Sequence, residues 1–182
     1  MKIILIQGAN MEYLGKREPE LYGTITAKEL DEILMNAAMV LDQKLEIRYT
    51  NIEGEAISWI YEAERNDFKG IIMNPAGFLF AGYALRECLK SVSLPYIEVH
   101  MTNIDRRGMH SITACEAKGM ITRMGVESYL LALSAIDKYS SELSTATTLP
   151  IAGKPLAIHK LLSPVKRPIS KQLMDCEILT II

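Results

Sequence analysis

The sequence predicts one α/β domain in which a parallel sheet is covered by helices on both faces. Short, continuous apolar runs of strand length alternate along the chain with segments whose apolar residues recur at helical spacing. Strands that alternate with helices are typical of a parallel sheet, because each strand returns to the sheet through a crossover. The 182 residues suit a single domain, and a hydrophobic content of 49% is enough for a sizeable core.

The predicted elements begin with a buried strand at residues 2–7. Thr26-Ala27-Lys28-Glu29 then has the pattern of a capping box, which starts a helix. Apolar residues at helical spacing continue that helix: Leu30, Ile33, Leu34, Ala37 and Leu41. The same criteria predict strands at residues 45–50, 70–73, 95–99 and 118–122, and helices after Gly54, at 81–90 and from Val126 to Ile136.

A turn is predicted where Asn74-Pro75-Ala76-Gly77 ends the third strand. Since crossovers between parallel strands are right-handed, the expected fold is a flavodoxin-like, doubly wound sandwich with a five-stranded parallel sheet. The glycines Gly8 and Gly15 are too far apart for a dinucleotide-binding motif, and the sequence contains no Walker motif.

Composition narrows the range of partners. The net charge of −2 gives no nucleic-acid footprint, and no apolar run approaches the length of a membrane span. The three cysteines, Cys88, Cys115 and Cys176, have neither metal-ligand spacing nor the pattern of a disulfide framework. We therefore expect a cytoplasmic protein that binds neither nucleic acid nor membrane.

The composition changes near residue 140, which divides the chain into a domain at 1–140 and a C-terminal extension at 141–182. The extension begins with a Ser/Thr-rich stretch and carries five Lys/Arg against three Asp/Glu. Its last residues, 176–182, are apolar and favour β structure. We expect this extension to pack on the rest of the protein or its oligomer, since so apolar an end is poorly suited to water.

The loop between Gly15 and Gly23 is the most informative segment of the chain. It follows the first strand, so it is predicted to lie over the carboxyl end of the sheet, where open α/β sheets bind ligands. Arg17 lies five residues before Tyr22. A nearby cation favours the charged form of a phenol, and a tyrosinate can abstract a proton.

Polar side chains follow four of the predicted strands at the point where each strand ends. They are Asn10; Asn51 and Glu53; Asn74; and Glu98, His100, Thr102 and Asn103. Each residue has an ordinary structural explanation, because Asn favours turns and a Glu can cap the next helix. Their convergence at one rim of a parallel sheet predicts a functional site there.

At this point the residues resemble a known family, the type II 3-dehydroquinate dehydratases, over roughly residues 1–139. The resemblance is carried by these segments: Asn10, Leu14-Gly15-Lys16-Arg17-Glu18-Pro19, Tyr22-Gly23, Asn51, Glu53-Gly54-Glu55, Asn74-Pro75, Ala84-Leu85-Arg86, Ile97-Glu98-Val99-His100, Asn103 and residues 125–133. It implies a flavodoxin-like fold, no metal and no organic cofactor. It also implies trimers assembled into a dodecamer, with each site touched by a neighbouring subunit.

The resemblance assigns five catalytic residues. Tyr22 is the expected base that removes a C2 proton from a cyclic keto-acid and forms an enolate. Arg17 is expected to hold Tyr22 as phenolate and to help close the site. His100 is the expected acid that protonates the departing C1 hydroxyl, and Glu98 is expected to orient it. Asn10 is expected to polarise the ketone or to hold a water that does so.

The substrate-binding set follows from the same resemblance. Asn74 is expected to bind substrate hydroxyls, while Met101 and Thr102 lie where the family binds the carboxylate, with Thr102 in place of a serine. Glu87 stands where the family has an aspartate that reaches into the neighbouring site. Arg107, or Arg106 by a different route, is a candidate to contact the ring.

Several positions depart from the family pattern. Phe80 replaces a histidine that contacts substrate, and a phenyl ring cannot hydrogen-bond a hydroxyl. The loop at residues 105–110 is about three residues shorter than in the family, so that Gly108 falls near the place of a ring-clamping arginine. Ile52 also replaces a histidine. The expected acid and base are retained, whereas residues that contact substrate hydroxyls in the family are replaced in this chain.

The predicted function is that of a 3-dehydroquinate dehydratase, which removes water from 3-dehydroquinate to give 3-dehydroshikimate. The first alternative is a dehydratase or enolising enzyme with the same chemistry on a less hydroxylated ring acid, suggested by Phe80 and the short loop. The second is a non-catalytic homologue that binds a metabolite or a partner. The intact Arg17, Tyr22, Glu98 and His100 argue against this second alternative.

Overall fold

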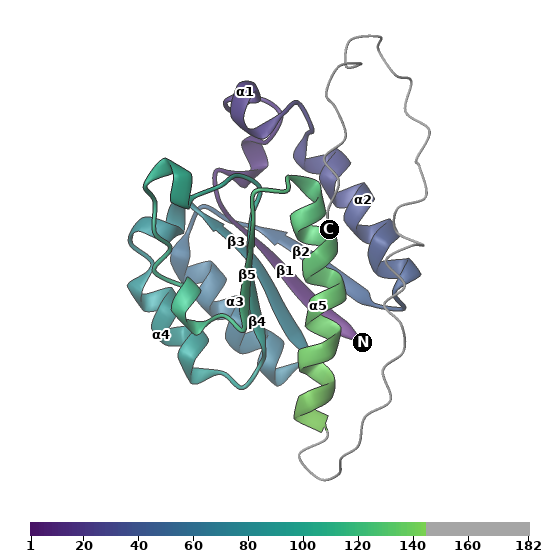
Figure 1. Ribbon diagram of the computed structural model, residues 1–182. Helices are drawn as coiled ribbons and strands as arrows, with labels where there is room; N and C mark the ends of the chain where they lie inside the picture. The colour runs from purple at the N-terminus through teal and green to yellow at the C-terminus, as the bar shows by residue number, and fades with distance from the viewer. Residues whose placement is uncertain (145–182) are drawn as a thin grey trace, which may run out of the picture. The chain divides into compact units, whose positions relative to one another are not determined.

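A computed structural model of the chain describes residues 1–144 (Figure 1). The helix that ends at Ser144 runs past the predicted boundary at residue 140. The rest of the predicted extension, and with it the expectation that the extension packs on the oligomer, lies outside the described residues.

One parallel sheet of five strands forms the centre of the described part. Its strands are β1 (Lys2–Ala9), β2 (Lys44–Tyr49), β3 (Gly70–Ala76), β4 (Tyr96–His100) and β5 (Gly119–Thr122). The strand order, β2-β1-β3-β4-β5, is that of a flavodoxin-like sheet and confirms the predicted fold class. The order changes direction between β1 and β3, which is where such sheets open a crevice for ligands.

Helices cover both faces of the sheet (Figure 1). One face carries α2 (Ala27–Val40) and α5 (Val126–Ser144), and the other carries α3 (Glu53–Arg65) and α4 (Tyr83–Ser91). The predicted capping box is present at the start of α2, where Thr26 Oγ1 accepts from the Glu29 backbone N–H at 3.2 Å and Glu29 Oε2 accepts from the Thr26 backbone N–H at 2.8 Å. None of the helices in residues 1–144 is long and apolar enough to cross a membrane.

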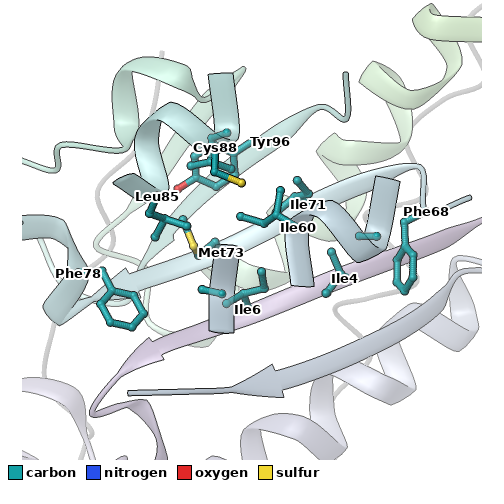
Figure 2. Packing of buried hydrophobic residues seen from close by; sticks show 13 residues of the cluster. Ile4, Ile6, Ile60, Phe68, Ile71, Met73, Phe78, Leu85, Cys88 and Tyr96 are labelled. Atoms are coloured by element: carbon teal, nitrogen blue, oxygen red, sulfur yellow. The ribbon is translucent and has the colours of Figure 1, made fainter. Parts of the chain in front are cut away.

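The core under α3 and α4 is built from alternate residues of the strands, as the two-residue period of a strand requires (Figure 2). Ile4 and Ile6 of β1 and Ile71 and Met73 of β3 meet the buried faces of both helices. The next strand contributes Tyr96, whose ring closes the cluster beside Cys88 of α4. This packing fixes the strand ends that build the site.

Two local predictions were wrong. Asn74 to Ala76 was predicted as a turn, yet these residues continue β3, because β1 also extends and pairs Gln7 with Asn74 and Ala9 with Ala76. The two strands approach closely here, so that a Cβ on Gly8 would lie 2.2 Å from the carbonyl oxygen of Pro75.

The second difference is in the segment between Gly15 and Gly23, which was predicted as a loop. It contains a short helical turn, α1 (Pro19–Tyr22), that begins at Pro19 because proline is already set for the first position of a helix. Short 3₁₀ turns occupy further loops: η1 (Met11–Tyr13), η2 (Gly77–Phe80), η3 (Asp105–Arg107) and η4 (Ala114–Glu116).

Candidate active site

A small cavity opens at the carboxyl ends of β3 and β4, next to the point where the strand order changes direction. Its volume is about 50 Å³. The lining comes from the strand ends and from the short turns above them: Met11, Arg17, Tyr22, Asn74, Ala76, Gly77, Leu79, Phe80, His100, Met101, Thr102, Ile104, Arg107 and Met109.

Tyr22 lies between two arginines at this cavity. The Arg17 guanidinium carbon is 5.1 Å from the centre of the Tyr22 ring, and that of Arg107 is 5.7 Å away. Arg107 Nη1 also donates to Tyr22 Oη at 3.1 Å and to Thr102 Oγ1 at 3.0 Å. Two guanidinium groups therefore lie beside the one phenol.

The structure thus separates the two arginine candidates of the short loop. Arg107 lines the cavity, whereas Arg106 is absent from the lining. The backbone N–H of Arg106 donates to Asn103 Oδ1 at 3.0 Å, so Asn103 holds the loop and does not face the cavity. The turn η3 is what directs Arg107 toward Tyr22.

His100 ends β4 at the floor of the cavity and is almost fully buried. Its Nε2 lies 2.7 Å from Oε1 of Glu98, which is completely buried behind it. This bond fixes the orientation of the imidazole ring. Glu98 does not line the cavity itself, and its expected role of orienting His100 stays a prediction.

The electrostatics of Glu98 depend on its hydrogen bonds. Burial by itself raises the pKa of the Glu98 carboxyl, because a charge is poorly solvated inside a protein. Donors around the carboxyl more than offset burial and hold its pKa below the ordinary value: His100 first, then Ser111, Tyr96 and Thr113. Glu98 is thus a buried anion at neutral pH.

Asn74 is held in one orientation at the cavity. Its Nδ2 donates to Tyr129 Oη at 2.8 Å, and its Oδ1 accepts from the Ala76 backbone N–H at 3.1 Å. Tyr129, on α5, donates in turn to Gln7 Oε1 at 2.9 Å. Tyr129 and Gln7 were not predicted from the sequence, because a tyrosine on a helix and a glutamine in a buried strand carry no signal of a shared bond.

Other residues predicted at the rim have structural partners instead. Asn10 is exposed in the left-handed region at φ 75° and does not line the cavity; its backbone N–H donates to Asn51 Oδ1 at 2.7 Å. The Asn10 side chain does lie near Gly77, which lines the cavity. Glu53 accepts from the Leu85 backbone N–H at 2.9 Å, so it caps α4 and not α3, the next helix.

Much of the cavity lining is apolar. Phe80 lines it with 64% of its surface exposed, and Met11, Leu79, Ile104 and Met109 were not predicted there. Met101 and Thr102 line the cavity as expected from their positions.

Glu87 is exposed on α4 and does not line the cavity of its own chain. Its expected reach into a neighbouring subunit's site stays a prediction. No group of three potential metal ligands is found among residues 1–144.

Comparison with known proteins identifies the family. A family model for dehydroquinase class II matches residues 1–137. The chain belongs to this family. A 3-dehydroquinate dehydratase from Halalkalibacterium halodurans is 42% identical over 137 residues, which cover 74% of this chain and 94% of that protein.

Experimental structures of the family have the same fold. The type II dehydroquinase from Butyrivibrio crossotus has a TM-score of 0.73 and 32% identity, over 75% of this chain and 97% of that one. A 3-dehydroquinate dehydratase-like protein from Bifidobacterium longum has a TM-score of 0.58 and 29% identity, over 79% of this chain and 98% of that one. The dehydroquinase fold thus accounts for all of the sheet and its covering helices.

Proposed function

We propose that this dehydroquinase class II protein is a 3-dehydroquinate dehydratase, a hydro-lyase that needs neither metal nor organic cofactor. The observation that carries the proposal is the meeting of two proton-transfer groups at one cavity. Tyr22 lies there between two guanidinium groups, and His100 lies there on a buried carboxylate. Relatives named 3-dehydroquinate dehydratase share about 40% of the sequence over this region.

In the proposed reaction, the Tyr22 phenolate takes a proton from C2 of the substrate, and the electron pair forms an enolate. Asn10, or a water that it holds, stabilises the enolate oxygen. The enolate then collapses, the C1–O bond breaks, and His100 gives its proton to the departing hydroxyl, which leaves as water. Proton exchange with solvent returns Tyr22 and His100 to their starting forms.

Substrate binding in this proposal uses the opposite side of the cavity. Met101 and Thr102 hold the carboxylate, and the orientation of Asn74 by Tyr129 prepares its amide for ring hydroxyls. Arg107 and Tyr22 lie on short turns outside the sheet, so they are the groups that can move to admit a ring.

The assembly is proposed to be a dodecamer of trimers, in which Glu87 of a neighbouring subunit completes each site. This is supported by the exposure of Glu87 and of large apolar side chains at the same rim, among them Ile52 at 60% and Tyr83 at 63%. A cytoplasmic location is proposed on the scattered cysteines alone.

A second candidate function is favoured by the lining of the cavity. Phe80 and four other apolar side chains face the space where ring hydroxyls are read, and a hydroxyl left without a partner there costs about 1–3 kcal/mol. The candidate is the same dehydration of a less hydroxylated ring acid.

The proposed function is tested by mixing the purified protein with 3-dehydroquinate and following the ultraviolet absorbance of the conjugated enone product. We expect turnover that is lost in Tyr22→Phe. No product at millimolar substrate, together with turnover of a less hydroxylated cyclic 3-keto acid, would replace the first function by the second. No turnover of either acid would overturn both.

A further inference from the structure

We propose that Tyr96 and Thr113 are positioning residues that keep Glu98 ionised and thereby hold His100 in its proton-donating state. The inference rests on the proposed function insofar as it gives His100 the role of acid. It concerns two hydroxyl groups that do not line the cavity, and it predicts how the pH dependence of the site is set.

Three of the side chains, those of Tyr96, Glu98 and His100, lie in a row along β4. Tyr96, Glu98 and His100 are at every second position of the strand, so their side chains project from the same face of the sheet. Glu98 Oε1 lies 2.7 Å from His100 Nε2, and Glu98 Oε2 accepts a hydrogen bond from Tyr96 Oη at 2.6 Å. The carboxylate thus lies between a ring nitrogen and a phenol.

Thr113 reaches the same carboxylate from another part of the chain. It is fully buried just before η4, and its Oγ1 donates to Glu98 Oε2 at 2.7 Å. Ser111 Oγ lies 3.1 Å from Thr113 Oγ1 and also contributes to the lowered pKa of Glu98. One oxygen of Glu98 therefore receives two hydroxyl donors, and the other serves His100.

The charge of Glu98 depends on these donors. A carboxylate with no exposed surface is costly unless hydrogen bonds replace its water, and without them the group takes up a proton instead. Burial, followed by the adjacent charge of Glu98, raises the pKa of Tyr96 well above its ordinary value, so its hydroxyl remains a donor across the working range. A threonine hydroxyl does not titrate in this range, so it also remains a hydrogen-bond donor.

A protonated Glu98 would no longer support His100 as a cation. The proton-donating state needs an imidazolium, and its counter-ion is the Glu98 carboxylate at 2.7 Å. The two hydroxyls stabilise that carboxylate, so they protect the acid without touching the substrate. The role of these residues is separate from packing. Phenylalanine would fill the space of the Tyr96 ring and valine that of Thr113, and each would lack only the hydroxyl.

Arg17, Tyr22 and Arg107 line the same cavity as His100. The other titratable groups near the cluster are few and are paired or buried. The adjacent strands β3 and β5 carry none. On α4, Cys88 is buried and Arg86 Nε pairs with Glu116 Oε1 at 3.1 Å. Cys115 of η4 contributes to the raised pKa of Tyr96, and its Sγ lies beside Glu116, the partner of Arg86. On α5, Tyr129 is buried and bonded to Asn74 and Gln7.

The test compares Tyr96→Phe, Thr113→Val and the double variant with the unmodified protein, using Tyr61→Phe as the control, a tyrosine on α3 whose hydroxyl lies 3.4 Å from Ser91 Oγ. The first readout is the pH dependence of kcat/KM. Removing a donor makes Glu98 take up a proton at higher pH, so the acid limb, on which activity is lost as Glu98 is protonated, should move to higher pH. A hydrogen bond to a charged group corresponds to about one to two pKa units, and the double variant should shift by about one pH unit or more.

The second readout needs no turnover. The ring signals of His100 can be followed by NMR against pH in the free protein, because the chain has only three histidines, His100, His110 and His159. We expect the protonation of Glu98, observed through the His100 ring signals, to move to higher pH in the double variant, with Thr113→Ser in place of Thr113→Val restoring part of the shift. The His100 ring signals of the Tyr61→Phe variant should change with pH as they do in the unmodified protein.

A folded double variant whose histidine titration and acid limb stay within 0.3 pH units of the unmodified protein, a margin of about 0.4 kcal/mol, would overturn the inference. The two proposals also fail separately. If the unmodified protein does not turn over 3-dehydroquinate, the proposed function fails, and the NMR titration still decides the inference. If a single variant does not fold, the other single variant carries the same comparison.

Discussion

The guanidinium of Arg107 donates through Nη1 to the hydroxyl of Tyr22, across 3.1 Å. Arg107 comes from the shortened loop, where the family resemblance left open which arginine reaches the site. The same nitrogen donates to Thr102 Oγ1, so one cation links the proposed base to the proposed carboxylate pocket. The loop at residues 105–110 thus supplies an arginine to the proposed base.

Arg107→Met should lower kcat/KM for the accepted substrate by about 10- to 100-fold, since a hydrogen bond to a charged group is worth roughly 1.5–3 kcal/mol. Methionine keeps an unbranched side chain, so packing over Tyr22 is largely conserved. Arg106→Met is the matched control, because Arg106 does not line the cavity. Steady-state kinetics check this; equal losses in both variants would remove Arg107 from the site.

Tyr22→Phe should lower kcat by about 10²- to 10⁴-fold, because it deletes the proposed base and leaves the ring in place. Tyr83→Phe serves as the control, since Tyr83 is 63% exposed on α4 and does not line the cavity. Light scattering of both variants should give the size of the unmodified assembly. Kinetics of Tyr22→Phe within threefold of the unmodified enzyme would show that another group is the base.

Phe80→His should raise kcat/KM for 3-dehydroquinate modestly, because it returns a hydrogen-bonding group to the apolar side of the cavity. The gain is limited, since Met11, Leu79 and Met109 still line that side. Phe80→Leu is the control for a change of size without polarity. If histidine instead weakens 3-dehydroquinate binding, the apolar lining is not what restricts the substrate.

The sequence predicted the sheet well because its signals are local. Buried strands appear as apolar runs, and helices such as α2 show both their period and their capping box. The end of β3 could not be predicted in the same way. Asn74 and Pro75 favour turns in isolation, and they are held as strand only by pairing with β1, where Gly8 lets the backbones approach.

Tyr22 and His100, which were expected from the sequence, both line the cavity, and their roles stay predictions. The supporting residues were harder to find. Tyr96 did carry a signal, since it shares the two-residue alternation of Glu98 and His100, whereas Thr113 reaches Glu98 from a separate loop. Tyr129 on α5 resembles ordinary core packing and carries no signal of its bond to Asn74.

Glu98 should make the stability of the protein fall in acid. Its folded pKa is lowered, so its contribution is fully present above the unfolded value of about 4.3 and is lost as pH falls through the lower folded value. Glu98→Gln should therefore be less stable near neutral pH and should lose less stability on acidification below about pH 4. Urea unfolding at several pH values measures both curves; parallel curves would show that the native carboxyl is not stabilised as an anion.

Gly8→Ala should destabilise the fold strongly, because the new Cβ would lie 2.2 Å from the carbonyl oxygen of Pro75, and this is backbone that cannot move aside without disturbing the β1–β3 pairing. Overpacking of this kind costs about 1–3 kcal/mol or more. Gly54→Ala is the control: nothing lies within 4 Å of its added Cβ, and alanine in α3 should gain about 0.5–1 kcal/mol. Urea denaturation of both variants should give changes of opposite sign, and an unaltered midpoint for Gly8→Ala would mean that the two strands do not approach so closely.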